Sequence, residues 1–232
     1  MKVISIITTV YNEKDCIDEF VNQINELKKK ITNYKLELTF INNGSTDDTL
    51  DKIIQLNKKH KWIKVISLVR NFGYQNALYC GLENSSGDLT FMLDVDLEDP
   101  PYLLVDFINI IEEGYHIAYG IRNKREENFI LQAARKLWYK IFKFLSDHNS
   151  ILYMSEYALI TKDVKDVILS NNSSFVFIRN EISYSGYKYK GIEYYRKKRS
   201  KGKASSSSII YIFQFALAGI INSTTKPLRL IS

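Results

Sequence analysis

Three acidic residues alternate with apolar ones in the stretch LDVDLEDPP, which covers residues 93–101. Asp94, Asp96 and Glu98 are spaced two positions apart, so in an extended backbone their carboxylates point to the same side. Residues 89–93 are mostly apolar and predict a buried strand that ends where these acids begin. Like charges at such a place repel each other and lose hydration. A hard divalent cation with oxygen ligands would compensate them and would keep positions open for phosphate oxygens.

Two other interpretations of these acids fit less well. A D-x-D triplet is common, and on its own it is not a binding site. A calcium-binding EF-hand loop needs Gly at its sixth position, where this chain has Asp99 followed by Pro100. The position of the triplet favours a site, because open α/β sheets bind their ligands at the carboxyl ends of the strands.

The first half of the chain alternates between strand and helix patterns. Apolar and β-branched runs predict strands at residues 2–10, 36–41, 63–68 and 89–93. Helical spacing between them, and again at 102–113, predicts the intervening helices. Shorter strands are expected at 116–120 and 152–160. This order predicts an α/β fold with a doubly wound, mostly parallel, right-handed sheet and flanking helices.

Polar residues follow each of the first four predicted strands. The carboxyl ends of parallel strands share one edge of a sheet, so we expect these side chains to converge on a single crevice. They are Tyr11, Asn12, Glu13, Asn42, Asn43, Arg70, Asn71, Asp94 and Asp96.

The composition fits one globular domain, with 232 residues of which 45% are hydrophobic and 25% charged. The net charge of +6 is uneven, because residues 188–203 carry eight Lys and Arg against one acid, Glu193. Such a run indicates phosphate, nucleic acid or anionic lipid as a partner, or a merely solvated face. Two cysteines, Cys16 and Cys80, indicate reduced thiols in a cytosolic setting.

Two segments have broad apolar faces, although no run in the sequence has the length of a membrane span. Residues 129–145 have a helical apolar face with lysines along its flank, which is typical of an interfacial helix or of a core helix with outward lysines. Residues 209–221 are apolar but short, and Gln214 interrupts them. The amino terminus lacks the features of a signal peptide.

Five stretches in order make the chain resemble family 2 glycosyltransferases of the GT-A fold. Within them it is most similar to polyprenyl-phosphate glycosyltransferases of the dolichol-phosphate mannose synthase type. The stretches are SIITTVYNE (5–13), FINNGSTDDT (40–49), RNFGYQNAL (70–78), LDVDLEDPP (93–101) and KPLR (226–229). Residues 199–203 resemble the family's R-x-x-G segment. The chain departs from the family at Asn42 and Asn43, where Asp-Asp is usual, and at residues 204–206.

The resemblance implies a role for each matching residue. Asp94, Asp96 and Glu98 would bind Mg²⁺ or Mn²⁺ against the donor diphosphate, with Asp96 in the catalytic set. Arg199, also in that set, and Lys203 would hold phosphate. Glu156, an acid inside the predicted strand 152–160 and the third member of the catalytic set, would lie near the acceptor and, for a phosphate acceptor, orient it. The other residues implied to bind substrate are Thr9, Tyr11, Glu13, Asn42, Asn43, Arg70, Asn71 and Gly73.

We therefore expect an inverting glycosyltransferase that moves a sugar from a nucleotide donor, UDP- or GDP-linked with UDP favoured, to a polyprenyl phosphate. The expected parts are a GT-A catalytic domain at residues 1–204 and an amphipathic, membrane-proximal segment at 205–232 with interfacial helices. The enzyme would sit peripherally on the anionic cytoplasmic face of the membrane, or be anchored there if the natural chain continues. Nucleic acid is not an expected partner, and a homo-oligomer is left open.

Two alternatives remain open on the sequence. One is a soluble glycosyltransferase that acts on a glycan hydroxyl, for which Glu156 would be a necessary base. The other is a catalytically weak subunit that binds nucleotide sugar, which only the change at Asn42 and Asn43 indicates.

Overall fold

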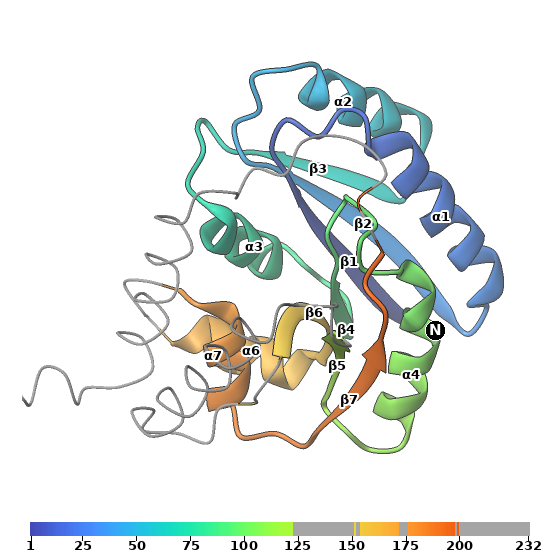
Figure 1. The fold of residues 1–232 in the computed structure, drawn as a ribbon, viewed down its shortest axis with the longest axis vertical. Coiled ribbons are helices and arrows are strands. Elements are labelled where there is room, and N and C mark those ends of the chain that lie inside the picture. The colour runs from blue at the N-terminus through green and yellow to red at the C-terminus, as the bar shows by residue number, and fades with distance from the viewer. Residues whose placement is uncertain (123–150, 152–153, 172–175, 198, 200–232) are drawn as a thin grey trace, which may run out of the picture.

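The computed structural model describes residues 1–122, 151, 154–171, 176–197 and 199, and shows helices on both faces of a single sheet (Figure 1). Within these residues the sheet has seven strands in the order β3-β2-β1-β4-β6-β5-β7. The strands are β1 (Lys2–Val10), β2 (Tyr34–Asn42), β3 (Ile63–Ser67), β4 (Leu89–Met92), β5 (Ile117–Arg122), β6 (Met154–Thr161) and β7 (Tyr189–Tyr194).

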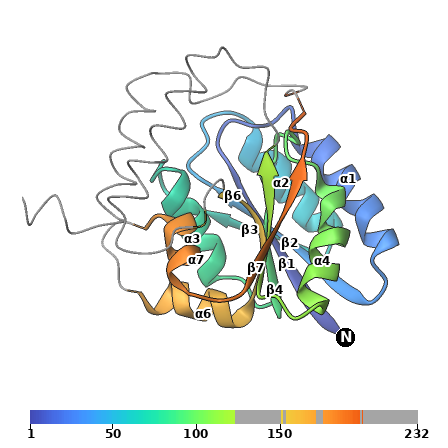
Figure 2. The same ribbon diagram turned by 60° about the horizontal axis from the view of Figure 1, so that its bottom comes forward.

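The helices form two layers (Figures 1 and 2). Helices α1 (Ile17–Lys30), α2 (Thr49–Lys59) and α4 (Leu104–Glu112) cover one face, and the short η1 turn (Pro101–Leu103) precedes α4. Helices α3 (Tyr74–Glu83), α6 (Lys162–Ser170) and α7 (Ile178–Tyr184) cover the other face.

Strand β6 runs against its neighbours. It pairs antiparallel with β4 and with β5, whereas the pairs β1–β2, β1–β4, β2–β3 and β5–β7 are parallel. Among the described strands, all except β6 therefore end at one edge of the sheet, and β6 begins there. We call this edge the catalytic edge, because the predicted site residues lie along it.

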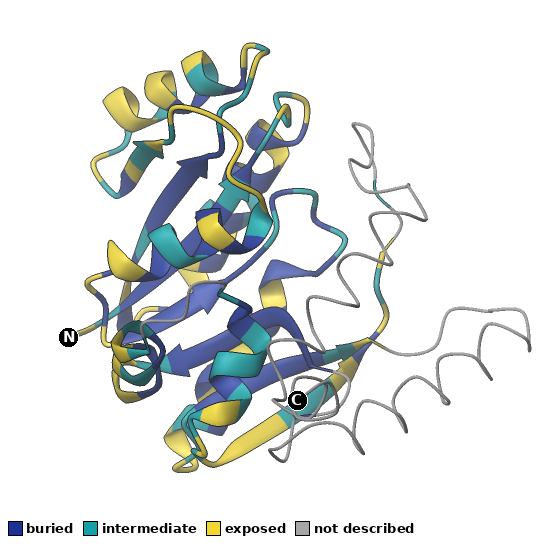
Figure 3. Cartoon of the chain, turned by 90° about the vertical axis from the view of Figure 1, so that its left-hand side faces the viewer, coloured by how far each residue is buried: buried dark blue, intermediate teal, exposed yellow. Residues whose placement is uncertain are grey.

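The side chains of the central strands alternate between two apolar cores. Ile6 of β1 packs with Phe20 of α1 and Phe107 of α4 in the first core. Ile7, its neighbour, packs with Leu78 of α3 in the second. Figure 3 shows the result, with buried strands between helices whose outer faces are exposed. Because helices cover both faces of the sheet, side chains on both sides of the central strands are buried, and these strands are almost continuously apolar.

The structure confirms the predicted α/β fold and its mostly parallel sheet. It differs in detail, because the reversal of β6 was not predicted and helices α6 and α7 had no counterpart in the sequence analysis. Lys203, both apolar segments (129–145 and 209–221) and the membrane-proximal segment 205–232 lie outside the described residues. Of the helices that the structure describes, none has the length and apolarity to cross a membrane.

Candidate active site

The D-x-D pair follows the end of β4 at the middle of the catalytic edge. Asp94 is half-buried, and its Oδ1 accepts a 2.9 Å hydrogen bond from the Tyr74 hydroxyl at the start of α3. Burial, together with the charges of Asp96 and Asp99, raises the pKa of Asp94 to about 7. Asp96 Oδ1 accepts the Glu98 N–H at 3.1 Å, which closes the turn. The site therefore holds more negative charge than its surroundings neutralise.

The turn itself is strained. Leu97 has a φ of 59°, in the left-handed region that residues with a Cβ avoid at a cost of roughly 1–2 kcal/mol. Its side chain is buried in the first core, so packing holds this backbone in place. Strain of this kind is found where function fixes a backbone.

Arg199 joins the turn to the loop after β1. Its guanidinium forms an ion pair with Glu13 and lies 3.9 Å from Asp96 Oδ2. Burial raises the pKa of Glu13, although the Arg199 charge opposes that rise. The structure thus brings together three residues that the sequence analysis had placed in one site from distant parts of the chain.

The loops after β1 and β2 are hydrogen-bonded to each other. The Asn12 N–H donates to Ser45 Oγ at 3.1 Å, and the Thr46 N–H donates to Asn12 Oδ1 at 2.8 Å. The Glu13 N–H donates to Thr49 Oγ1 at 2.9 Å. These bonds hold the two loops together at the catalytic edge.

Asn42 and Asn43 are buried, and both ends of each amide have protein partners. Asn42 donates to Ser67 Oγ at 2.9 Å and accepts the Ser45 N–H at 3.1 Å. Asn43 donates to Asn71 Oδ1 at 3.1 Å and accepts the Phe72 N–H at 2.9 Å. In this structure the two amides connect β2 to the loop after β3.

The remaining residues predicted to bind donor lie around these loops. Thr9 and Tyr11 are half-buried, at the end of β1 and just after it. Arg70 is exposed, and its guanidinium stacks 3.9 Å from the centre of the Phe72 ring. Gly73, with a φ of 85°, donates its N–H to Asn71 Oδ1 at 2.8 Å and starts α3.

Glu156 lies in β6 on the α3 side of the same edge. Arg179 of α7 donates from Nε and Nη2 to Oε1, at 3.1 and 2.9 Å, and from Nη2 to Oε2 at 3.0 Å. The Gln75 amide adds a 3.0 Å bond to Oε1. Burial alone would raise the pKa of Glu156, but Arg179 and Gln75 outweigh it and lower the pKa below its usual value. Glu156 is therefore a well-bound carboxylate and a weak base.

Asp94 and Asp96 fit a divalent cation that is shared with phosphate oxygens. Mg²⁺ is usually held by one or two carboxylates together with substrate phosphates. The predicted third ligand, Glu98, instead pairs with Arg196 at 2.7 Å. Across the described ranges, no three His, Cys, Asp or Glu side chains gather as a metal-binding group. Within the part of the chain that the structure describes, Asp94 and Asp96 have no such arginine pair at 2.7 Å, and Glu98 as a third ligand stays a prediction.

A known protein family matches most of this sequence. The sequence model of glycosyl transferase family 2 matches residues 5–169, which is well over half of the chain. The chain belongs to glycosyl transferase family 2. This match covers the strand ends described above, from the loop after β1 to Glu156.

Relatives of this family 2 glycosyltransferase match along nearly its whole length. It is 29% identical over 229 residues to the uncharacterized glycosyltransferase YkcC of Bacillus subtilis. The aligned residues cover 98% of this chain and 70% of YkcC. It is also 29% identical over 227 residues to the bactoprenol glucosyl transferase of Shigella phage SfV, 97% of this chain and 73% of the relative.

A solved structure confirms the GT-A fold of the family 2 glycosyltransferase. Glucosyl-3-phosphoglycerate synthase from Mycobacterium tuberculosis, in complex with Mn²⁺, UDP-glucose and phosphoglyceric acid, aligns with a TM-score of 0.63. The alignment covers 96% of this chain and 79% of that one at 19% identity. At this identity the likeness concerns the fold alone.

The basic segment of this glycosyltransferase is not a uniform patch. Lys190 pairs with Glu113 at 2.6 Å, Arg196 with Glu98, and Arg199 with Glu13. Acids on other elements therefore neutralise several of the cations that the sequence analysis had assigned to phosphate, lipid or a solvated face.

Sequence reasoning missed several residues that hold the site of the glycosyltransferase in shape. Tyr74 and Gln75 follow Gly73 within a stretch that carried the resemblance, yet no charge or spacing marked them. Asp99 was the overlooked acid before Pro100, and Arg196 was hidden in the basic run. Arg179 lay in a region where no helix was predicted.

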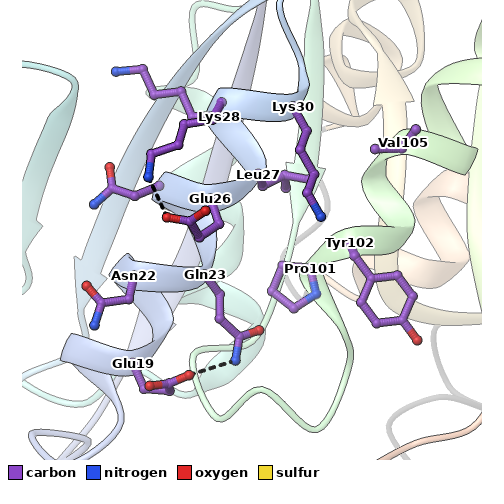
Figure 4. Close-up of a pocket in the computed structure, with 12 residues that line it drawn as sticks. Glu19, Asn22, Gln23, Glu26, Leu27, Lys28, Lys30, Pro101, Tyr102 and Val105 are labelled. Atoms are coloured by element: carbon purple, nitrogen blue, oxygen red, sulfur yellow. Dashed lines mark hydrogen bonds and ion pairs between the residues drawn. The ribbon is translucent and has the colours of Figure 1, made fainter.

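A separate groove lies outside the catalytic edge of the glycosyltransferase, between α1 and the start of α4 (Figure 4). Tyr102 and Val105 face the polar side of α1 across it. On α1, Gln23 donates to Glu19 and Lys29 to Glu26. None of the predicted site residues lines this groove, so it is not part of the candidate active site.

Proposed function

We propose that this glycosyltransferase transfers a sugar from a nucleoside diphosphate donor, UDP-linked in the first instance, to a polyprenyl phosphate with inversion. In this proposal the donor lies against the loops after β1, β2 and β3, and its diphosphate reaches the D-x-D pair. The supporting observation is that Glu13, Asp96 and Arg199 meet at the catalytic edge.

Each part of the site has a distinct task in this reaction. Asp94 and Asp96 would hold Mg²⁺ or Mn²⁺, which supplies positive charge to the leaving nucleoside diphosphate. Arg199 would donate charge-assisted hydrogen bonds to phosphate oxygens. Tyr74 orients Asp94 through its hydroxyl, so the carboxylate keeps one direction in the crevice.

The lowered pKa of Glu156 and its hydrogen bonds favour a phosphate acceptor over a hydroxyl acceptor. A hydroxyl acceptor must give its proton to a general base, which works best when the pKa of that base lies near the pH of the reaction. A phosphate acceptor is already ionised at neutral pH and needs no such base. Glu156 is held by Arg179 and Gln75, and its lowered pKa makes it a poor proton acceptor. We therefore assign Glu156 to orienting the acceptor side of the crevice.

The names and ligands of two similar proteins support a nucleotide-sugar donor and a polyprenyl-phosphate acceptor for this enzyme. The phage SfV relative is named for glucose transfer to bactoprenol, a polyprenol. The mycobacterial enzyme with the same fold was solved with Mn²⁺, UDP-glucose and a phosphate-bearing acid. A lipid acceptor also accounts for the apolar segments 129–145 and 209–221, because the crevice must reach a phosphate held at the bilayer surface. We propose for this reason that the enzyme works at the membrane surface; the cytoplasmic face and the choice between peripheral and anchored attachment stay predictions of the sequence analysis.

The test is transfer of radiolabelled glucose from UDP-glucose to polyprenyl phosphate in detergent, with Mn²⁺, Mg²⁺ or excess chelator. We expect a lipid-linked product that requires both the lipid phosphate and the metal. Asp96→Asn should abolish transfer, while Asp106→Asn, an exposed acid on α4, should not change it. Transfer to a glycan hydroxyl but not to the lipid would refute the acceptor, and full activity in chelator would refute the metal.

A further inference from the structure

The chain that leaves β7 lies against the D-x-D turn. In Figures 1 and 2 it runs from the orange strand beside the green loop that follows β4. The Lys197 N–H donates to the Glu98 carbonyl at 2.9 Å. Arg196 Nη2 pairs with the Glu98 carboxylate at 2.7 Å. We call residues 194–197 the β7 arm; Arg199 follows it.

A buried carboxylate anchors this arm. Asp99 is 1% exposed, and its Oδ1 lies 3.3 Å from Arg196 Nε and accepts a hydrogen bond from the Tyr194 hydroxyl. Arg122 of β5 pairs with its Oδ2 at 2.9 Å. Asp99 thus lies between Arg122 of β5 and Arg196 of the β7 arm. Arg196 Nε is within ion-pair distance of Asp99 but has no hydrogen-bond partner among the described residues, so this contact is electrostatic.

The segment between Arg196 and Arg199 is short, so the position of Arg196 limits the position of Arg199. Arg199 lies three positions after Arg196, and an extended chain spans at most about 3.3–3.6 Å per residue. With Arg196 fixed on the D-x-D turn, the Arg199 backbone stays within roughly 10 Å of it. That distance keeps the Arg199 guanidinium in reach of Glu13 and Asp96, where the structure places it.

An arginine suits this position better than any other residue. Its planar fork can contact two carboxylates at once, and here Nη2 faces Glu98 while Nε faces Asp99. The side chain is 20% exposed, so water weakens these contacts little. A lysine would offer one point of charge and would release one of the two acids.

We propose that Arg196 is a positioning residue: it docks the β7 arm on Glu98 and Asp99 and so places Arg199 for the donor diphosphate. The second half of this inference rests on the proposed function of Arg199; the docking does not. Arg196 itself touches neither of the D-x-D carboxylates in the contacts described here.

The experiment compares Arg196→Met with Arg122→Met in the full chain. Both variants remove one arginine from Asp99, but only the first removes the contact to Glu98. The first readout is hydrogen exchange of the Lys197 amide, which reports its bond to the Glu98 carbonyl. We expect Arg196→Met to lose this protection by at least tenfold and Arg122→Met and Arg199→Ala to retain it. Unchanged protection in a folded Arg196→Met would overturn the proposal.

The second readout is UDP binding by calorimetry with Mn²⁺, which needs no acceptor. Arg196→Met and Arg199→Ala should each weaken binding about tenfold or more, and the double variant should be no weaker than Arg199→Ala. Full additivity, or an equal loss in Arg122→Met, would show a general structural effect and overturn the positioning role. If the wild type bound no UDP while Arg196→Met still lost Lys197 protection, the proposed function would fail and the docking would stand.

Discussion

The amides of Asn42 and Asn43 illustrate how single residues decide what this site can be. Each donates one hydrogen bond and accepts another, and the partners lie on β3 and in the loops after β2 and β3. A carboxylate at position 43 would only accept, and would face Asn71 Oδ1 without a proton to share, whereas the Ser67 hydroxyl could donate to a carboxylate at position 42. Asn43 is therefore matched by its surroundings, which argues that this departure from Asp-Asp is not a sign of a decayed site.

The Glu156–Arg179 pair predicts how stability depends on pH. Its lowered pKa means that ionised Glu156 stabilises the fold above pH 4.5, its ordinary value, and that this contribution is lost as the pH falls through the folded value. Glu156→Gln should lower the free energy of unfolding at pH 7 by about 2 kcal/mol or more, because breaking a buried pair costs ~3–5 kcal/mol and Arg179 keeps some solvent contact. The difference from wild type should shrink below pH 4.5 in urea unfolding.

The same variant also separates the two kinds of acceptor. For a phosphate acceptor, we expect Glu156→Gln to retain transfer within about tenfold when assayed well below its unfolding temperature. For a hydroxyl acceptor, loss of a base typically costs 10²–10⁴-fold. A loss of that size with the pH profile of a titrating carboxylate would contradict our assignment of Glu156.

At the scale of elements, the turn after β2 packs directly on the loop after β3. Gly44 has a φ of 72°, and a Cβ there would lie 2.4 Å from the Arg70 carbonyl carbon. Only glycine fits both the backbone conformation and the contact. The close approach brings Asn43 within reach of Asn71 and so joins two loops that the proposed donor would contact.

Gly44→Ala should therefore disturb both stability and donor binding. We expect a loss of at least about 1–3 kcal/mol from backbone strain, and more from the clash, with UDP affinity reduced at least tenfold. Gly114→Ala is the matched control, because Gly114 also has a positive φ, 90°, but its Cβ would meet nothing within 4 Å. That variant should lose stability and keep its UDP affinity. Equal affinities for the two variants in calorimetry would show that the packing of these loops does not shape the donor site.

The sequence predicted those elements whose signals are local. Strands β1 to β4 and their helices carry continuous apolar runs and helical spacing, so their order and the convergence of polar ends were foreseeable. The direction of β6 was not, because pairing beside β4 is decided by tertiary contacts and not by the composition of the strand. For the same reason Arg179, Arg196 and Asp99 could not be assigned: each acquires its role from a partner at least 20 positions away.

At the scale of the molecule, two long segments of the chain connect to the catalytic edge. β5 ends there and β6 begins there, so residues 123–153 leave from this edge and return to it. β7 also ends there, so residues 200–232 continue from it. In the sequence, segment 129–145 therefore lies between β5 and β6, and segment 209–221 lies after β7.

We predict that the protein binds anionic vesicles and that the binding weakens with salt. Each lysine near an anionic surface contributes about 1 kcal/mol, and segment 129–145 carries Lys136, Lys140 and Lys143. Trp138→Glu with Phe142→Glu should abolish co-sedimentation with vesicles at low salt and leave UDP binding intact. If wild type ignored such vesicles, or the double variant bound as well as wild type, the soluble transferase would be the better description.

The edge of the sheet opposite the catalytic edge is a suitable place to attach a tag. β1 starts there, and Met1 is 82% exposed, beside Val3, whose N–H donates to Asp88 in the turn before β4. A biotin or affinity tag at Met1 would tether the molecule to a sensor with its crevice facing the flow. For surface-based binding assays, attachment at the amino end is therefore the orientation to choose.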